Sequence, residues 1–577
     1  MKKVNRPSQT KAATAEPRRF IWWPWAVGVL ALLLVFQVYA PALNGGFVWD
    51  DLSLPFFAPD ITPDIGRFVR DLRPLLMLSF WVDFRLAPDQ TTAQTSGQPE
   101  VVRAFAEQFH STNVILHTLV STLVALIIFK LLEWAGVTVR LRAAIAVLSG
   151  AVFLLHPLQT ESVAYVASRS EVLSVLFYYA AFTVFLYRRD ESITLWRSLA
   201  ILALFGAAIA VKEHTLTLPA LLLLTDYFWG RGGLRKNRIL YGLIAVAGAV
   251  GVVFVVRVLS SANTAGFRMR GMTPLDFFYT QCRVIWIYLR MFFLPFGQNI
   301  DPDVRVSHSL FEHGAIFGLI ALIALVAAAW IYRKRFPLAS FGILVFLLLI
   351  APTASIVPIR DPLAEHRLYL PFLGLLLICA EFLRRLNFQR VILVGVAVLA
   401  VCSVLTYQRN RVWSSSLSLW QDSVNKAPDK YRPRFQLAYA EFKDGRCSDA
   451  VANYEAAARI GPVRDDLLID WGEALGCANR WYDALKKYQD AARLSNTAHI
   501  HTEVAVAYAN LRQFDFALDE LGQAEKIDPG FWKTYALRGQ IYEYRADHPD
   551  AAREYKHACA LNPRDNTACQ GAVRMSR

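Results

Sequence analysis

Apolar segments recur between Ile21 and Tyr407 of this 577-residue chain and constrain its fold more than any other feature. A helix rises ~1.5 Å per residue, so about 20 apolar residues are enough to cross a bilayer core of roughly 30 Å. A hydrophobic fraction of 55% is likewise typical of an integral membrane protein. The pattern predicts an all-α membrane part with about eleven transmembrane helices. The predicted spans have the approximate limits 21–40, 112–132, 142–157, 162–187, 197–211, 214–229, 239–259, 314–332, 338–352, 367–383 and 391–408.

The basic residues lie mostly in short tracts between these apolar segments, which explains the net charge of +14 without a nucleic-acid partner. With eleven spans, every basic cluster falls on one side, and the positive-inside rule assigns that side to the cytoplasm. We therefore predict a cytoplasmic tail over 1–20, a membrane domain over 21–410 and an external region over 411–577. The external compartment is predicted to be a bacterial periplasm, with the lumen of the endoplasmic reticulum as the alternative.

An adjacent pair of carboxylates, Asp50 and Asp51, stands just beyond the first predicted span and opens the external loop 41–110. An isolated pair of this kind is more often a solvated helix end or an N-cap. Other ionisable or polar residues, however, lie at the ends of spans on the same predicted face, and their one-sidedness indicates a pocket lined by both signs of charge. These residues are Arg73, His110, Asn113, His156, Glu161, Arg169, Lys212, Glu213, His214, Arg360, Glu365, His366 and Arg367.

Such a pocket suits a sugar carried on a lipid phosphate. Arginine and lysine at the membrane boundary can hold the phosphate and stabilise its charge as it leaves. A carboxylate whose pKa is raised by a like-charged neighbour can remove the proton of an attacking hydroxyl. One base without an acid catalyst predicts direct displacement with inversion at the anomeric carbon. We expect no cofactor and do not favour a divalent metal, although two carboxylates are a conceivable metal site.

A segment from Thr273 to Pro295 combines aromatic and cationic residues in an irregular pattern. It predicts an interfacial helix that lies along the outer membrane surface. A twelfth span is the alternative and would change the topology.

Internal repeats begin after Tyr407, where apolar runs give way to Ala, Tyr, Asp and Arg at helical spacing. Corresponding alanines recur at intervals of 34, 33 and 34 residues, with a small residue twelve positions before each one. The aligned alanines are Ala450, Ala484, Ala517 and Ala551, and the small residues are Ala438, Gly472, Ala505 and Gly539. This is the tetratricopeptide pattern over about four units, which predicts a helical solenoid with a concave, protein-binding face. Cys559 and Cys569 form either a disulfide on the oxidising side or buried thiols.

The order of several motifs resembles a known family. Phe-x-Trp-Asp-Asp at 47–51 and Leu-Arg-Pro-Leu at 72–75 are followed by HPLQTESVAYVASRSE from His156, KEHTLTLPALLLLTDYFW from Lys212 and AEHRLYLPFLG from Ala364. With the repeats behind them, they resemble the transmembrane and tetratricopeptide-repeat O-mannosyltransferases and their bacterial relatives. The resemblance implies the type C glycosyltransferase fold and a polyprenyl-phosphate sugar donor.

The same resemblance implies roles for individual residues. It implies that Asp50 or Asp51 is the catalytic base, with Asp50 favoured. It places the donor and its phosphate on Glu161, Arg169, Lys212, Glu213, His366 and Arg367. The chain has about four repeats where eukaryotic members carry many, so the sugar and the acceptor do not follow from the likeness.

Two hypotheses result. The first is an inverting, polyprenyl-phosphate-dependent glycosyltransferase that modifies Ser or Thr hydroxyls of an external protein held by the repeats, with a lipid or glycan acceptor as a variant. The second is a non-catalytic membrane scaffold whose repeats recruit external proteins. A scaffold has no reason to gather His156, Glu161, Lys212, His366 and Arg367 beside the Asp pair.

Overall fold

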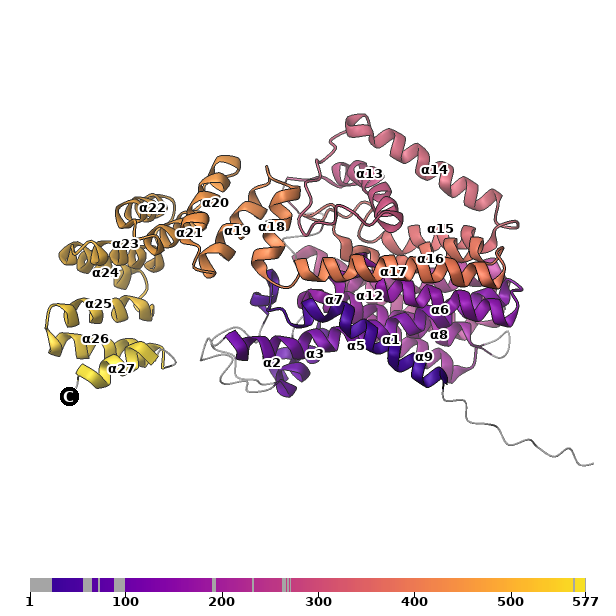
Figure 1. Ribbon diagram of the computed structural model, residues 1–577, viewed down its shortest axis with the longest axis horizontal. Helices are drawn as coiled ribbons and strands as arrows, with labels where there is room; N and C mark the ends of the chain where they lie inside the picture. The colour runs from indigo at the N-terminus through magenta and orange to yellow at the C-terminus, as the bar shows by residue number, and fades with distance from the viewer. Residues whose placement is uncertain are drawn as a thin grey trace, which may run out of the picture.

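The structure is a computed structural model that describes residues 23–54, 65–70, 73–87, 99–188, 193–230, 233–261, 266, 269, 271–563 and 566–575. Every regular element in these ranges is a helix, as predicted. The chain forms a helix bundle and an arm of shorter paired helices that extends from one end of the bundle (Figure 1).

The bundle contains a helix at each of the eleven predicted spans. These helices are α1 (Trp23–Leu43), α5 (Pro99–Trp134), α6 (Val139–Leu155), α8 (Arg169–Leu186), α9 (Leu195–Ile209), α10 (Leu218–Trp229), α12 (Arg238–Ser261), α14 (Ala315–Ile331), α15 (Pro337–Ile350), α16 (Phe372–Leu383) and α17 (Phe388–Val412). Two further helices, α2 (Ile65–Val69) and α3 (Pro74–Leu86), belong to the predicted external loop.

Four helical segments of the described chain are long and apolar enough to cross a membrane, or five if the bent pair Val139–Leu155 and Pro157–Ala164 forms one span. Shorter apolar helical stretches stand at most of the other predicted spans, namely Leu33–Leu43, Leu195–Ile209, Arg238–Val253, Pro337–Ile350 and Phe372–Leu383. The helical character of the spans is thus confirmed, whereas the number of eleven crossings remains a prediction.

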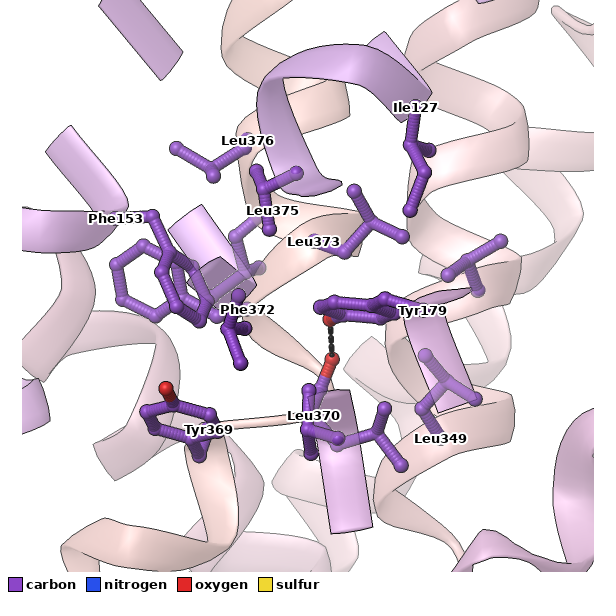
Figure 2. Close-up of a cluster of buried hydrophobic side chains, with 14 of the residues drawn as sticks. Ile127, Phe153, Tyr179, Leu349, Tyr369, Leu370, Phe372, Leu373, Leu375 and Leu376 are labelled. Atoms are coloured by element: carbon purple, nitrogen blue, oxygen red, sulfur yellow. Dashed lines mark hydrogen bonds between the residues drawn. The ribbon is translucent and has the colours of Figure 1, made fainter. Parts of the chain in front are cut away.

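The bundle core is built from apolar side chains of helices that are far apart in the sequence. Figure 2 shows Tyr179 of α8 among Ile127, Phe153, Leu349 and Phe372, and its hydroxyl donates a hydrogen bond to the Leu370 carbonyl oxygen at 2.5 Å. Burying apolar area at roughly 25 cal/mol per Å² is the main stabilising term for such a core. It holds the helix ends, and therefore the polar residues on them, in fixed positions.

The segment predicted to be interfacial forms the amphipathic helix α13 (Pro274–Phe293). It begins with Thr273 capping the amide of Asp276, and Trp286 donates a hydrogen bond to the Gly318 carbonyl of α14 at 3.0 Å. Within the described chain, α13 is not one of the segments long and apolar enough to cross a membrane. Its interfacial position stays a prediction.

After α17 the chain continues through α18 (Ser416–Lys426) into four helix pairs and a final helix. They are α19 (Tyr431–Lys443) with α20 (Cys447–Ile460), α21 (Asp465–Cys477) with α22 (Trp481–Leu494), α23 (Ala498–Asn510) with α24 (Phe514–Ile527), α25 (Trp532–Tyr544) with α26 (His548–Leu561), and α27 (Asn566–Met575). This is the paired-helix architecture that the repeats predict.

The small residues of the repeats do allow close helix packing. A Cβ added at Gly472 would collide with the ring of Tyr488, and one at Gly539 would lie 2.9 Å from the Tyr555 ring. The aligned alanines, such as Ala450, are fully buried. The structure also contains the disulfide Cys559–Cys569, and a second one, Cys447–Cys477, that the sequence did not predict.

Candidate functional site

One segment, residues 156–171, contacts Asp51, the 365–366 turn and Lys212, and also lines the apolar groove described below. It runs through η3 (Pro157–Gln159), α7 (Thr160–Ala164) and η4 (Val166–Ser168) into the start of α8. It is irregular because Pro157 lacks an amide hydrogen and cannot continue α6, so the chain bends by 50° there. Almost all of its side chains are buried. The segment therefore acts as a rigid platform for the loops that pack on it.

Asp51 binds to this platform with both carboxylate oxygens. Its Oδ1 accepts a hydrogen bond from the Ala167 amide at 2.7 Å, and its Oδ2 accepts one from the Val48 amide at 3.1 Å. The side chain is fully buried. Asp51 therefore fixes the short helix η1 (Trp49–Ser53) against the platform.

Asp50 is the exposed member of the pair. Burial of its surroundings and the charge of Asp361 raise the pKa of Asp50, while the Tyr165 hydroxyl and Arg432 lower it. Asp50 lines a pocket of about 540 Å³ together with Trp49, Arg360 and residues of the first repeats. Of the two carboxylates, Asp50 is the one that a ligand in this pocket can reach.

A second cluster joins Glu161 to the 365–366 turn. The Glu161 Oε1 atom lies 2.5 Å from His366 Nδ1, and its Oε2 accepts hydrogen bonds from the amides of Glu365 and His366 at 3.0 and 3.3 Å. Glu365 itself is fully buried, where burial raises its pKa to about 7, and it accepts hydrogen bonds from Gln298 Nε2 and the Asn299 amide, each at 2.7 Å. Glu365 thus organises the loops, whereas the partly exposed His366 can meet a ligand.

Glu171 extends this cluster toward the 212–214 turn. It lies 2.5 Å from Lys212 Nζ, 3.5 Å from His214 Nε2 and 3.9 Å from His366 Nε2. The structure thus brings Glu161, Lys212, His214 and His366 together around a carboxylate that the sequence analysis did not select.

Arg73 and Glu213 form a forked ion pair beside this cluster. Arg73 Nε and Nη2 donate to the two Glu213 carboxylate oxygens at 3.1 and 3.0 Å. The Arg73 charge lowers the pKa of Glu213 against the effect of burial. The pair ties the start of α3 to η5 (Glu213–Thr217), at the edge of the cluster.

Arg169, which the motif resemblance assigns to the phosphate, lies elsewhere. Its fully buried guanidinium contacts Asp83 at 2.5 Å and donates to Asn113 Oδ1 at 2.6 Å and to the Phe109 carbonyl at 2.9 Å. Because these groups and the protein core enclose it, Arg169 serves the packing of α3, α5 and α8 rather than a ligand. This corrects the predicted placement of Arg169 in the pocket.

Three other predicted site residues also support the loops. His110 stacks on Phe47 with 6.3 Å between ring centroids, and Asn113 donates to the Val163 carbonyl at 3.1 Å. Arg367 donates to the carbonyls of Asp361 and Pro362 at 2.6 and 3.1 Å. They hold the elements on which the exposed groups stand.

His156 lies at one end of an apolar groove of about 760 Å³. Its Nε2 atom is 3.0 Å from the Phe292 carbonyl oxygen, and its ring stacks on the Phe292 ring at 5.5 Å. The groove runs between α6, α16 and α17 and is lined almost entirely by hydrophobic side chains, among them Val394, Ala397 and Val401. His156 therefore marks where an apolar surface meets the polar platform.

Several site residues were not among those predicted from the sequence. Tyr165 and Glu171 stand inside the HPLQTESVAYVASRSE motif and carry a signal, because polar groups there are spaced along one short segment. Arg432 belongs to the first repeat, almost 400 positions after Asp50, and no sequence pattern joins the two. Across the described part of the chain, no group of three or more His, Cys, Asp or Glu is arranged to hold a metal ion.

The buried carboxyl group of Asp51 is expected to make the stability of the folded protein depend on pH. Burial, opposed by the backbone amides it binds, raises the pKa of Asp51 from 3.8 to about 7. The folded chain then holds a proton that the unfolded chain releases, so the free energy of unfolding falls as the pH rises from about 4 to about 7. We expect a higher thermal midpoint in detergent at about pH 5 than at about pH 8, with a smaller difference in Asp51→Asn. The difference between the two thermal midpoints should become smaller without vanishing, because Glu365 also has a raised pKa and lowers stability as the pH rises. An unchanged pH dependence in Asp51→Asn would contradict this assignment.

No family model matches the chain, but curated relatives do. It is 23% identical to a protein O-mannosyl-transferase of Caenorhabditis elegans over 476 residues, which cover 75% of this chain and 63% of the relative. It is 22% identical to the human protein O-mannosyl-transferase TMTC3 over 88% of this chain and 61% of the relative. The chain thus spans about three fifths of the length of these relatives.

Solved structures match a smaller part of the chain. The crystal structure of MamA is 18% identical with a TM-score of 0.24, covering 26% of this chain and 86% of that chain. The tetratricopeptide-repeat protein YrrB is 19% identical with a TM-score of 0.24, covering 30% and 87%. The curated relatives alone confirm the resemblance carried by the motifs: this chain is similar over most of its length to the transmembrane and tetratricopeptide-repeat protein O-mannosyltransferases.

Proposed function

We propose that the protein is an inverting glycosyltransferase that moves a sugar from a polyprenyl-phosphate donor to Ser or Thr hydroxyls of an external protein. The observation that carries the proposal is the platform 156–171, on which the Asp pair, the cluster around Glu171 and the end of an apolar groove meet. The names of the relatives support a protein acceptor and O-linked transfer, and make mannose the first sugar to test.

Asp50 is the base in this proposal. It faces the pocket, and its raised pKa favours proton uptake from a hydroxyl. The acceptor oxygen forms a bond to the anomeric carbon while the bond from that carbon to the phosphate oxygen breaks. The proton passes to Asp50, and the polyprenyl phosphate leaves with its negative charge. Attack opposite to the leaving group inverts the anomeric carbon.

The leaving phosphate is assigned to the basic side chains in and beside the Glu171 cluster. Side chains of Lys212, His366 and Arg73 are 17, 25 and 36% exposed, so each is held by an acid and still open on one side. A hydrogen-bond donor held in this way is oriented before the substrate arrives, which makes it effective at stabilising developing charge. No metal is needed for a singly linked phosphate in this scheme.

The apolar groove is assigned to the polyprenyl chain. Its lining side chains come from three helices of the bundle and from residues 292–296, and it ends at His156 on the platform. An isoprenoid chain placed there buries apolar area while its phosphate stays near the polar residues.

Filling the groove is expected to weaken binding of long donors. In Ala397→Trp, a large ring on α17 would occupy the space of the isoprenoid chain, and we expect the KM for a long-chain donor to rise about tenfold. The KM for a short, water-soluble analogue should change little. Ala400→Trp is the matched control, because Ala400 is exposed on the same helix but does not line the groove. Equal effects of the two variants would contradict the assignment.

The function is tested by incubating purified protein with radiolabelled polyprenyl-phosphate sugars and a Ser-containing acceptor protein. Transfer of label with inversion supports the proposal. Transfer only to lipid or glycan would change the acceptor class. No transfer from any donor would favour the scaffold hypothesis instead.

A further inference from the structure

The pocket that holds Asp50 is built jointly by the bundle and the repeats. Trp49 and Asp50 come from η1, and Ile359, Arg360 and Asp361 from the loop before η7 (Glu365–Leu368). The remaining lining residues belong to α19 and the start of α21 and are Tyr431, Arg432, Phe435, Gln436, Arg464 and Asp466. The repeats therefore form a wall of the site and are more than a tether beside it.

Direct contacts fix this wall against the bundle. Arg432 donates to both carboxylate oxygens of Asp361 at 2.7 and 3.3 Å, and its guanidinium lies 5.8 Å from the centroid of the Trp49 ring. Lys430 Nζ donates to Asp301 Oδ1 at 2.5 Å. Forked arginine–carboxylate pairs restrict orientation as well as distance. The first repeat is thus held in one position relative to Asp50.

Trp49 connects the repeats to the base itself. Its φ of 49° lies in the left-handed region, which non-glycine residues rarely adopt unless packing holds them there. The packing comes from Tyr165, stacked at 6.0 Å, and from Trp420 of α18, edge-on at 5.5 Å. Asp50 directly follows Trp49 in the chain, so the orientation of the Asp50 side chain depends on both α18 and the platform.

From this pocket an acidic face continues along the repeats. The first helices of neighbouring repeats contact one another, which makes α19, α21, α23 and α25 one continuous surface. On it, Asp470 and Glu473 of α21 are followed by Glu503 of α23, and their mutual repulsion adds to burial in raising the pKa of Asp470 and of Glu503 to about 7.

These carboxylates have little compensation from the protein. Lys443 and Lys533 act on them as nearby charges without forming an ion pair, and within the described residues the one ion-pair contact to this group is His499 to Glu503 at 3.7 Å. The Tyr454 hydroxyl, fully buried next to Asp470 and Glu473, has no hydrogen-bond partner in the described chain. Asp470 and Glu473 are half-buried and Glu503 is buried, and carboxylates that are removed from water without a cation are costly, so a cationic ligand would remove that cost.

We propose that the acceptor is an extended polypeptide segment that lies along this face with basic side chains near Asp470, Glu473 and Glu503 and places its hydroxyl at Asp50. A chain of this kind matches the site, because the joint pocket offers aromatic rings and groups of both charges while the adjoining face is acidic. The inference rests on the proposed function and adds the class of acceptor to it.

The test measures binding of fluorescent peptides to the full-length protein in detergent without any donor. Two Ser-containing peptides of equal length are compared, one with lysines and one with glutamates beside the same central sequence. The lysine peptide is expected to bind about tenfold more tightly, and this preference should fall to about twofold in the double variant Asp470→Asn/Glu473→Gln. Asp483→Asn/Asp519→Asn is the control, because it removes the same charge from exposed positions on the second helices of two repeats.

A second variant separates the pocket from the acidic face. Gln436→Trp would fill the joint pocket and is expected to weaken both peptides about tenfold without changing the preference between them. Equal binding of the two peptides to the wild type, or a preference unchanged in Asp470→Asn/Glu473→Gln, would overturn the inference. Because no donor is present, these outcomes do not depend on sugar transfer. Loss of transfer with intact peptide preference would instead count against the proposed function alone.

Discussion

Replacing Asp50 by Asn is expected to lower the rate of sugar transfer by about 10³-fold, because general bases contribute on the order of 10²- to 10⁴-fold. The amide keeps the size of the side chain but cannot take the proton of the acceptor. Asp50 is exposed, and an amide in its place can still contact the Tyr165 hydroxyl on the platform, so the thermal midpoint should change little. The measurement is single-turnover transfer from a radiolabelled polyprenyl-phosphate sugar, with donor binding measured separately.

Two companion variants make this result specific. Asp303→Asn removes an exposed carboxylate from a loop, and this variant should transfer sugar at the wild-type rate. Asp51→Asn should lower activity mainly through a disturbed η1 and should change the pH dependence of stability. If Asp50→Asn retained wild-type transfer, the base would lie elsewhere, and Glu161 or Glu213 would be examined next.

Replacing Arg169 by Met is expected to destabilise the protein by about 3–5 kcal/mol, the usual cost of leaving one partner of a buried ion pair uncompensated. Asp83 would remain buried without its cation, and the carbonyls of Ser79 and Phe109 would lose their donor. The expected readout is a much lower thermal midpoint in detergent or loss of folded protein. The KM for the donor should stay unchanged in whatever fraction folds.

The double variant Arg169→Met/Asp83→Leu tests whether the unpaired Asp83 carboxylate causes the loss of stability. Removing both charges should recover part of the lost stability, because no buried carboxylate remains. A stable Arg169→Met protein with a raised KM for the donor would contradict the structural role. It would indicate that Arg169 binds the phosphate of the donor.

The structure separates two residues that the motifs treat alike. Arg169 and Lys212 are both cations in the most specific motifs, yet Arg169 is enclosed by the core whereas the Lys212 side chain stays 17% exposed beside Glu171. Side-chain chemistry identified both as candidates. Only burial and the nature of their partners distinguish a packing residue from one that can meet a substrate.

Much of the molecule was predictable from the sequence because its signals are local and periodic. Apolar runs placed a helix at each predicted span, and the spacing from Ala450 to Ala551 predicted four helix pairs. The polar residues near Asp50 were predictable as a group because they recur at segment ends on one side. Periodicity says nothing, however, about how far a helix reaches across a membrane, so the number of crossings did not follow.

The sequence by itself determined the helical class, the repeats, the family likeness and many of the polar residues of the candidate site. The tertiary structure alone decided that Asp51 is tied to the platform while Asp50 faces a pocket, and that Arg432 of the first repeat closes that pocket. The physical reason is that exposure and pairing depend on contacts between segments hundreds of residues apart. Those contacts are set by packing of the whole bundle and carry no signature in any short stretch of chain.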